Sequence, residues 1–317
     1  MLKRLDVTNF KSLANTSIEL NKFNVLVGPN NSGKSNIMDA VMMLSTAIST
    51  RSWGGGYDYI RKKGGMRKYH YFGTPIEKPI RCVGYFEDNQ GKFEYQITLT
   101  ESTGKETPDF SWDRFKGTPW RFYRFIPLHM RSPHGISESL VLEDDGTNLS
   151  SVLHALFVKR HQSFSEIESH LKAVSKEIEH LSVPIVRSQG TQVAIKEKPF
   201  EGEFTADMMS DGTLSLLAHL VALYGPERPD LACFEESENF VHPHIIEHLI
   251  DIMKKSESQV IISTHSPTFL NHIKPEDLII VSKMDGKTQC SRLSNPEKYR
   301  DIPLGELWYS GELGGAP

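Results

Sequence analysis

The chain has 317 residues, of which 38% are hydrophobic and 24% are charged, so it is long enough to bury one large core or two lobes. A net charge of -4 gives no overall attraction to nucleic acid, and any contact with DNA or RNA would need a local basic patch. The three cysteines are isolated, which disfavours a disulfide scaffold or a zinc site. No apolar run is long enough to span a membrane, and the N-terminus lacks the apolar core of a signal peptide, so we expect a cytoplasmic protein without membrane contact.

The start of the chain predicts paired strands, then a strand, a glycine-bearing loop and a helix. Residues 2–10 alternate apolar and polar side chains as a half-buried strand does, and residues 18–20 are the predicted hairpin partner. Residues 23–27 predict a short buried strand, and residues 36–48 carry apolar side chains at helical spacing. The turn between the first two strands presents Lys11 near the loop, where this lysine either contacts a nucleotide or is an ordinary solvated turn residue.

The loop itself is Gly28-Pro29-Asn30-Asn31-Ser32-Gly33-Lys34-Ser35, which fits the pattern G-x-x-x-x-G-K-[ST]. A strand, such a loop and a helix start together present backbone N–H groups on the positive end of a helix, which suits a triphosphate. Lys34 would reach the β- and γ-phosphates, and the Ser35 hydroxyl would bind Mg²⁺. The alternative is a chance match in an ordinary turn, which the strand-loop-helix context disfavours. We therefore predict that the chain binds a nucleotide.

Residues 51–72 form a basic cluster in which lysine and arginine are interleaved with tyrosine. Such a mixture can follow a nucleic-acid backbone and stack on bases, so the segment from Arg51 to Tyr69 is a candidate contact for DNA, RNA or a protein partner. A surface loop with ordinary solvated charges is the alternative.

The middle of the chain predicts a sheet followed by helices. Residues 80–100 alternate with a period of two around a central turn, which predicts a β-hairpin, and residues 122–126 predict a further strand. An antiparallel sheet therefore follows the first helix, in place of the repeated βαβ units of a dinucleotide-binding fold. Residues 149–181 carry helical signal with a polar break at 161–163 and are too few for a long coiled-coil arm.

A polar motif precedes an apolar helix predicted at 214–224. Ser210-Asp211-Gly212-Thr213 supplies an N-cap serine and a glycine that lets the backbone approach a ligand closely. Taken alone, this motif is simply the start of a capped core helix.

Two predicted buried strands near the end of the chain lead into chemically active residues. The strand at 231–234 ends in Glu235-Glu236, which suits Mg²⁺ and an attacking water, although a strand emerging into solvent is the alternative. The strand at 259–263 leads to His265, and a lone histidine after a strand is more often structural than catalytic. Its order and spacing relative to the acid pair favour a functional role.

In this order, the motifs resemble those of ABC-type ATPases of the SMC/RecF-like group. The similarity is greater to the small bacterial AAA_21/AAA_15-type ATPases related to the ATPase half of OLD-family nucleases. It covers nearly the whole chain, including Asn9-Phe10-Lys11-Ser12 and the tail at 304–315. It implies an α/β fold, an ABC-type P-loop ATPase head with a mixed central sheet, an antiparallel β-lobe and a helical lobe. We expect a single domain with three parts: the Walker A half at 1–50, the β-lobe and helical insertion at 51–205, and the signature, Walker B and switch-histidine half at 206–317.

The resemblance also implies ATP and Mg²⁺ as cofactors and a role for each matching residue. Glu235 stands at the Walker B acid and would bind Mg²⁺ with Ser35, while Glu236 stands at the base that polarises the attacking water. His265 stands at the switch histidine that contacts the γ-phosphate. Two identical heads would clamp two ATP molecules face to face, each signature motif meeting the nucleotide of the other copy. The nucleotide-binding residues expected are Asn30, Asn31, Ser32, Gly33, Lys34, Ser35, Asn36, Lys11, Ser210, Asp211 and Gly212.

Some positions depart from the pattern of the group. Glu235 replaces the commoner aspartate, and Ser237 stands where proline is usual. We expect these two departures to affect the rate of hydrolysis more than nucleotide binding. We expect residues 127–131 to correspond to the Q-loop, although the segment contains no glutamine. After His265 we expect no TOPRIM nuclease domain.

The favoured function is an ATP-driven dimerising switch that controls a separately encoded effector, such as a nuclease or toxin, or a DNA transaction. Anti-phage defence and DNA repair are the processes the resemblance suggests. One alternative is a nearly non-hydrolysing scaffold that holds an effector with ATP bound. A transporter subunit is disfavoured because residues 210–213 differ from the transporter signature LSGGQ, and an intrinsic nuclease would need more metal-binding acids.

Overall fold

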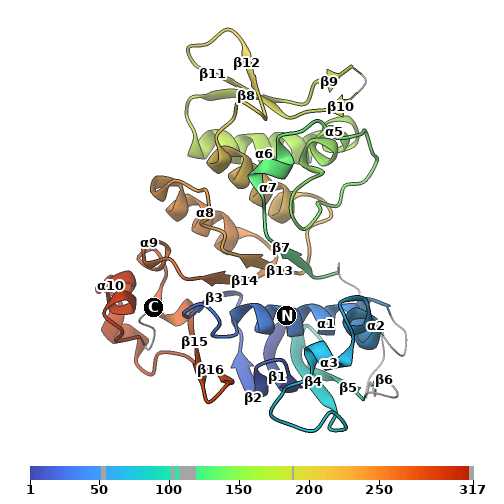
Figure 1. Cartoon of the computed structure of the whole chain (residues 1–317). Coiled ribbons are helices and arrows are strands. Elements are labelled where there is room, and N and C mark those ends of the chain that lie inside the picture. Colours follow the sequence, from blue (N-terminus) through green and yellow to red (C-terminus); the bar gives the residue numbers. More distant parts are fainter. Residues whose placement is uncertain (51–54, 101–103, 107–118, 188, 314–317) are drawn as a thin grey trace. The chain divides into compact units, whose positions relative to one another are not determined.

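A computed structural model describes residues 1–50, 55–100, 104–106, 119–187 and 189–313. Its contacts divide the chain into two compact units, unit 1 (Met1–Arg121 with Gln259–Pro317) and unit 2 (Phe122–Ser258). The single domain with internal boundaries after residues 50 and 205 stays a prediction, and the contact-based boundaries follow Arg121 and Ser258 instead. Figure 1 labels most elements of both units.

Unit 1 contains four neighbouring strands of a mixed sheet, in the order β16-β15-β3-β14. β3 (Phe23–Val27) runs parallel to both of its neighbours, β14 (Gln259–Thr264) and β15 (Leu278–Met284). β16 (Lys287–Ser291) is antiparallel to β15. Every residue of β3 and β14 is buried, as expected of parallel strands covered on both faces, and both strands confirm the sequence predictions.

The second sheet of unit 1 is antiparallel, in the order β2-β1-β4-β5-β6. Its strands are β2 (Leu13–Glu19), β1 (Leu2–Phe10), β4 (Ile80–Asp88), β5 (Gly91–Leu99) and β6 (Gly104–Glu106). β4 and β5 pair from Ile80 to Leu99 around a tight turn, which confirms the predicted hairpin. Helices α1 (Lys34–Thr50) and α2 (Gly55–Lys62) pack on this sheet (Figure 1). Shorter helical segments of unit 1 are α3 (Met66–Tyr69), α9 (Pro267–Leu270), α10 (Leu304–Tyr309) and the 3₁₀ turns η2 (Pro275–Asp277) and η3 (Pro296–Tyr299).

Unit 2 is built around the buried helix α7. Its helices are α4 (Pro127–Met130), α5 (Leu149–Lys159), α6 (His161–Val174), α7 (Asp211–Tyr224) and α8 (Pro243–Lys255). α7 is buried along most of its length because α4, α5, α6 and α8 all pack against it. Its strands are β7 (Arg121–Tyr123), β8 (Ile178–Ser182), β9 (Ile185–Val186), β10 (Gly190–Thr191), β11 (Ala194–Glu197), β12 (Glu203–Thr205) and β13 (Leu231–Glu235).

Two sequence predictions in unit 2 are wrong in detail. The helical signal at 149–181 divides at Arg160, and its last part is the strand β8, which pairs with β11. So few apolar residues cannot distinguish a short strand from the end of a helix. The strand predicted at 122–126 ends at Tyr123, and Pro127 begins the short helix α4. All three parts of the expected α/β fold are nevertheless present: a mixed sheet, an antiparallel lobe and a helical lobe.

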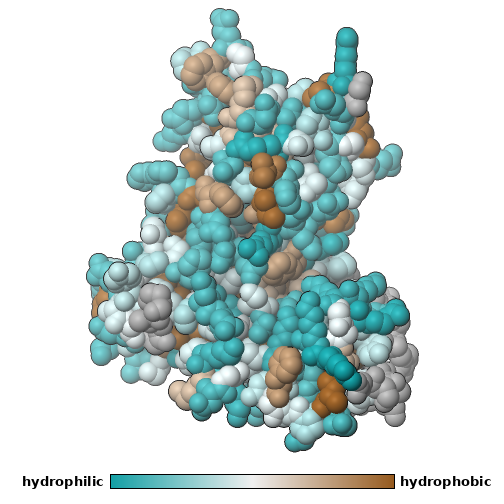
Figure 2. Space-filling model, viewed as in Figure 1, coloured by the Kyte–Doolittle hydropathy of each residue, from teal (hydrophilic) through white to brown (hydrophobic). Residues whose placement is uncertain are grey.

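One face of the molecule is mainly polar. On the face drawn in Figure 2, hydrophilic residues predominate and apolar residues are scattered among them. Within the described ranges, no helix is both long enough and apolar enough to cross a membrane.

Candidate nucleotide-binding site

The loop at residues 28–33 connects β3 to α1 and is closely packed at both of its glycines. A Cβ atom at Gly28 would lie 2.2 Å from the carbonyl oxygen of Val281 and 2.6 Å from Ser32 Oγ. Gly33 has a φ of 112°, in the left-handed region, and a Cβ atom there would lie 2.1 Å from Thr288 Oγ1. Packing of the loop against β15 and β16 therefore requires glycine at both positions of the motif.

The lysine predicted to bind phosphate lies across this loop. Lys34 Nζ donates hydrogen bonds to the carbonyl oxygens of Gly28, at 2.6 Å, and Pro29, at 3.1 Å. Ser32 is buried, and its Oγ has no hydrogen-bond partner within the described residues. Such a hydroxyl costs about 1–3 kcal/mol when it is left without a partner. A ligand rich in acceptor oxygens, such as a phosphate, would offset that cost, so the loop fits the group predicted for it.

The switch histidine predicted in unit 1 lies at the same sheet edge as the loop. In the parallel pair of β3 and β14, Val27 is in register with Thr264. Gly28 and His265 directly follow these two residues, so both leave the sheet at its carboxyl edge. Ligands of open α/β sheets bind at this edge. The position of His265 therefore suits a contact with a nucleotide held by the loop.

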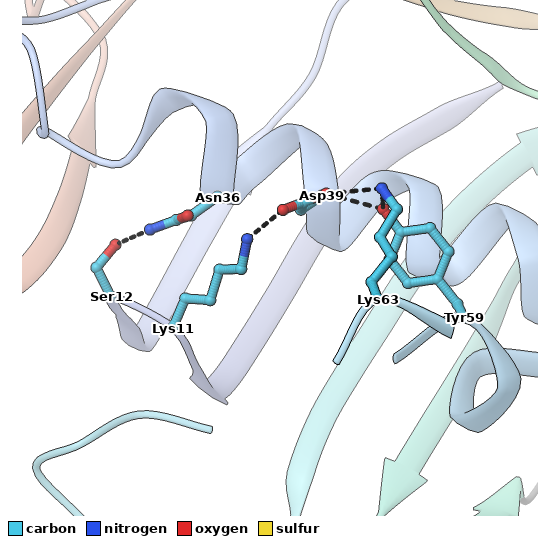
Figure 3. A network of polar contacts seen from close by, with 6 residues as sticks. All are labelled: Lys11, Ser12, Asn36, Asp39, Tyr59 and Lys63. Atoms are coloured by element: carbon cyan, nitrogen blue, oxygen red, sulfur yellow. Dashed lines mark hydrogen bonds and ion pairs between the residues drawn. The ribbon is translucent and has the colours of Figure 1, made fainter. Parts of the chain in front are cut away.

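Lys11 belongs to a polar network on α1 (Figure 3). Its ammonium pairs with the Asp39 carboxylate and lies 4.5 Å from the ring centre of Tyr69. The Tyr59 hydroxyl donates to the same carboxylate at 2.8 Å, and Lys63 Nζ lies 3.5 Å from it. Two lysines thus share one carboxylate, which leaves a local excess of positive charge close to the start of α1.

The described part of the basic segment predicted at 51–69 is largely helical, and two of its tyrosines contact other residues of the protein. Residues 51–54 lie outside the described residues, and the rest forms α2 and α3. Tyr69 is buried; burial and the nearby Asp39 raise its pKa to about 12. The Tyr59 hydroxyl is hydrogen-bonded to Asp39, and the side chain is half-buried. Neither Tyr59 nor Tyr69 is therefore an exposed ring on which a base could stack. The cations of the segment that are exposed are Arg61, Lys62, Lys63, Arg67 and Lys68.

In unit 2, the residues predicted to be the signature motif form the N-terminus of α7. Ser210 is the N-cap, as predicted, and its Oγ accepts a hydrogen bond from the Thr213 backbone N–H at 3.1 Å. A Cβ atom at Gly212 would lie 3.0 Å from the Phe240 carbonyl oxygen, so the start of the helix lies against the loop that follows the acid pair. Phe240 has a φ of 71° and is exposed.

Arg131 fixes this helix start from the segment expected to be the Q-loop. Its guanidinium pairs with Asp211 at 2.6 Å and also donates to the carbonyl oxygens of Ala206 and Asp207, both at 2.9 Å. The Gln192 side chain in turn donates to the Arg131 carbonyl oxygen at 2.8 Å. The negative charge of Asp211 at the helix N-terminus is therefore neutralised by a side chain that sequence reasoning did not single out.

The acid pair lies at the end of β13. Glu235 is the last residue of the strand, its side chain is 15% exposed, and Arg124 Nη1 lies 3.5 Å from its carboxylate. Glu236 has a φ of 51°, which is uncommon for a residue with a side chain, and accepts a hydrogen bond from Asn239 Nδ2 at 2.8 Å. Strained backbone of this kind is concentrated at functional sites. Within the described ranges, no group of three or more His, Cys, Asp or Glu side chains could hold a metal ion.

An uncharged cluster supports the strand that carries the acids. His219 on α7 is fully buried, its ring lies 5.0 Å from that of Phe234 and 4.8 Å from that of Phe125, and its Nδ1 bonds to the Ser215 carbonyl oxygen. Burial lowers the pKa of His219 to about 4, so this histidine is neutral at pH 7. β13 therefore rests on neutral groups.

Comparison with known proteins gives one family and several structural relatives. Residues 23–271 match the family model AAA_21, described as "AAA domain, putative AbiEii toxin, Type IV TA system". A protein of Helicobacter pylori (strain ATCC 700392 / 26695) named "ATP/GTP phosphatase" is 20% identical over 326 residues, covering 85% of this chain and 86% of that protein.

Solved structures of SMC heads have the same fold. A head bound to the C-terminal winged-helix domain of ScpA has a TM-score of 0.68 at 16% identity, covering 94% of this chain and 99% of that one. The head of the Thermotoga maritima protein has a TM-score of 0.56 at 14% identity, covering 92% and 99%. At these identities the likeness shows the fold alone. Because the family model matches more than half of the chain, the chain belongs to the family "AAA domain, putative AbiEii toxin, Type IV TA system", and it has the fold of SMC head domains.

Proposed function

We propose that the chain binds ATP at residues 28–35 and hydrolyses it to ADP and phosphate with Mg²⁺. The observation that carries this proposal is the loop itself. It has glycines where a Cβ atom would collide, and a buried Ser32 hydroxyl without a partner among the described residues. A phosphate chain would supply the acceptor oxygens that such a loop needs. The name of the Helicobacter pylori relative, "ATP/GTP phosphatase", supports the same activity.

Binding would use side chains and backbone of unit 1. Lys34 would exchange its two carbonyl partners for the β- and γ-phosphates, and the backbone N–H groups of Asn30 to Asn36 would surround them. Lys11 would add a second positive charge if it left Asp39. Mg²⁺ would neutralise phosphate charge, with Ser35 and Glu235 as its protein ligands. Mg²⁺ usually keeps water and phosphate oxygens, so one or two protein ligands suffice.

Hydrolysis would depend on one carboxylate as a proton acceptor. Water attacks the γ-phosphorus, the bond to the bridging oxygen of ADP breaks, and Glu236 would hold the proton that the water loses. Asn239 would orient that carboxylate through its hydrogen bond. His265 would contact the γ-phosphate.

We further propose that the working form is a homodimer with two ATP molecules between its heads. Ser210, Asp211 and Gly212 would meet the nucleotide of the second copy, since a helix N-terminus favours an anion. The pairing of Asp211 with Arg131 supports this, because it removes a negative charge that would repel a phosphate.

The dimer would act as a switch for a separately encoded effector, in anti-phage defence or DNA repair. One solved SMC head is bound to the winged-helix domain of ScpA, which supports a protein partner for this chain as well. Exposed cations on α2 and α3 are the candidate contact for DNA or RNA, through phosphates rather than through stacking of Tyr59 or Tyr69.

A second candidate is a slowly hydrolysing, ATP-bound scaffold. Arg124 lies 3.5 Å from the carboxylate of Glu235, where it would compete with Mg²⁺ for that acid. Steady-state turnover of ATP distinguishes an active switch from such a scaffold.

Calorimetric titration of ATP with Mg²⁺ into wild type and Lys34→Ala tests the binding site. Removing the lysine of the loop should weaken binding at least about a hundredfold, because it removes a charge-assisted contact from a buried position. The matched control is Lys92→Ala, which removes an exposed lysine on β5 opposite Glu87. Equal affinity of wild type and Lys34→Ala would refute the assignment.

Mixing two inactive variants tests the dimer. Ser210→Arg should spare ATP binding and prevent closure by its bulk, with Ser210→Ala as the control for loss of the N-cap alone. A mixture of Ser210→Arg and Lys34→Ala chains forms one intact composite site per heterodimer, so ATPase activity should return in part. A mixture that stays inactive, while wild type with ATP remains monomeric, would contradict the dimer.

A further inference from the structure

The hairpin of β15 and β16 contacts the phosphate loop along its length. The carbonyl oxygen of Val281 occupies the space beside Gly28, and Lys283 Nζ lies 3.5 Å from Asn31 Oδ1. Thr288 on β16 lies against Gly33, and its Oγ1 donates to the Ser32 carbonyl oxygen at 2.8 Å. The residues of this hairpin lie beyond the segment matched by the family model, which ends at residue 271.

The hydrogen bonds around Thr288 have only one consistent direction. A threonine hydroxyl has one proton, and that of Thr288 goes to the Ser32 carbonyl oxygen. Ser12 Oγ, 2.7 Å from Thr288 Oγ1, must therefore be the donor in that pair. Ser12 in turn accepts from Asn36 Nδ2 at 2.7 Å, a contact drawn in Figure 3. A continuous chain of donors thus runs from Asn36 on α1 to the carbonyl of Ser32.

The chain of hydrogen bonds orients one peptide group of the loop. Ser12, Thr288 and Ser32 are all buried, so water does not compete for these bonds. The peptide between Ser32 and Gly33 is planar, and in a trans peptide the carbonyl and the N–H point in opposite directions. Holding the Ser32 carbonyl toward β16 therefore directs the Gly33 N–H away from β16.

We propose that Thr288 is a positioning residue for nucleotide binding: it holds the Ser32–Gly33 peptide so that the Gly33 N–H faces the phosphates of the bound nucleotide. The inference rests on the proposed ATP site and assigns to β16 a part in forming it. Thr288 does not touch the nucleotide; it acts through the Ser32 carbonyl. Without its hydroxyl the peptide would be free to rotate, and an N–H donor of the loop would lose its direction.

Three variants isolate this role. Thr288→Val keeps the shape of the side chain and removes the hydroxyl, whereas Thr288→Ser keeps the hydroxyl. The matched control is Thr16→Val, because Thr16 Oγ1 donates to the backbone carbonyl of Thr288 at 3.1 Å, is buried, and bonds to no atom of the loop. Loss of that bond loosens the same strand without removing the contact to Ser32.

Two measurements decide the matter. In calorimetry with ATP and Mg²⁺, Thr288→Val should raise the Kd about tenfold, while Thr288→Ser and Thr16→Val stay within about twofold of wild type. In hydrogen exchange without nucleotide, peptides covering residues 28–35 should exchange faster in Thr288→Val only. If Thr288→Val does not fold, Ser12→Ala replaces it, with a smaller rise in Kd of about threefold expected.

The inference is overturned if Thr288→Val binds ATP within twofold of wild type and leaves exchange of the loop unchanged. It is also overturned if Thr16→Val weakens binding as much, since loosening of the strand would then explain both. Absence of ATP binding by wild type would refute the proposed function, whereas the exchange of residues 28–35 would still report whether Thr288 holds the loop.

Discussion

The loop at residues 28–33 of unit 1 accepts hydrogen bonds from two buried side chains, the Thr288 hydroxyl and the Lys34 ammonium, whereas the contacts of the acid pair of unit 2 include exposed side chains. Ser32 is fixed through Thr288, and both residues are buried. Glu235 is paired with Arg124, whose side chain is 63% exposed, and Glu236 is bonded to the exposed Asn239.

This difference indicates which of the two regions, the loop or the acid pair, is preorganised before a nucleotide binds at the proposed site. Buried hydrogen bonds leave a single arrangement of the loop, because breaking one leaves a polar group unsatisfied. An ion pair with a mostly exposed arginine contributes less than about 1 kcal/mol and is exchanged easily. We therefore expect the loop to keep its arrangement when a nucleotide binds at the proposed site, whereas the contacts of the two acids to Arg124 and Asn239 can change.

The largest expected effect concerns the acid pair. Glu236→Gln should reduce kcat at least about a hundredfold, because an amide cannot accept the proton of the attacking water. ATP affinity should stay within about threefold, since the amide oxygen can still accept from Asn239. Glu227→Gln, an exposed acid of the same unit, is the control. Wild-type turnover by Glu236→Gln would show that another group is the base.

The next largest expected effect concerns His219, the neutral histidine that packs against β13, the strand that carries the acids. The pKa of His219 falls from an ordinary value near 6.5 to about 4 on folding, so the unfolded chain binds more protons between these values. Stability from this group is present above pH 6.5 and is lost as the pH falls toward 4. Wild type should lose about 2 kcal/mol of unfolding free energy between pH 7 and pH 5 through His219.

The measurement is urea unfolding at both pH values, with His219→Phe and His219→Leu as the variants. Both variants should flatten the pH dependence in this range, where most carboxylates are still ionised. A dependence as steep as in wild type would mean that His219 is not the titrating group.

The smallest expected effect concerns the exposed partner of Glu235. Arg124→Gln removes the competing cation, so the Mg²⁺ concentration for half-maximal ATPase activity should fall about two- to fivefold. Arg228→Gln, which removes an exposed pair with Glu257, should leave it unchanged. If Arg124→Gln instead raises the Mg²⁺ concentration needed, Arg124 supports binding of Mg²⁺. The contact between Arg124 and Glu235 would then be part of the site, and the contrast between the loop and the acid pair would be weaker.

Elements with a strong local pattern could be predicted from the sequence. β1, β3 and the hairpin of β4 and β5 follow from alternation and from turn residues, and the N-cap of α7 follows from Ser210. The loop at 28–35 carries its motif within eight consecutive residues, so its place on a strand, a turn and a helix was also predictable.

The partners that hold the site could not be predicted, because they are distant in the sequence. Thr288 reaches Ser32 across 256 residues, and Arg131 reaches Asp211 across 80. Neither has a motif of its own, and a single sequence contains no record of such pairs. The contacts of Tyr59 with Asp39 and of Tyr69 with Lys11 were likewise not predictable, since both partners lie on other segments.

The separation of 256 residues between Ser32 and Thr288 also has a consequence for synthesis in the cell. At about 5–20 residues per second, a ribosome delivers the loop tens of seconds before β16. The strands β14 and β15, which are the parallel neighbours of β3, are also synthesised long after the loop. A nascent or truncated chain therefore presents the motif without the strands that shape it. Because a ligand stabilises only the state that binds it, cellular ATP would favour completed chains over unfinished ones and leave the latter open to proteolysis.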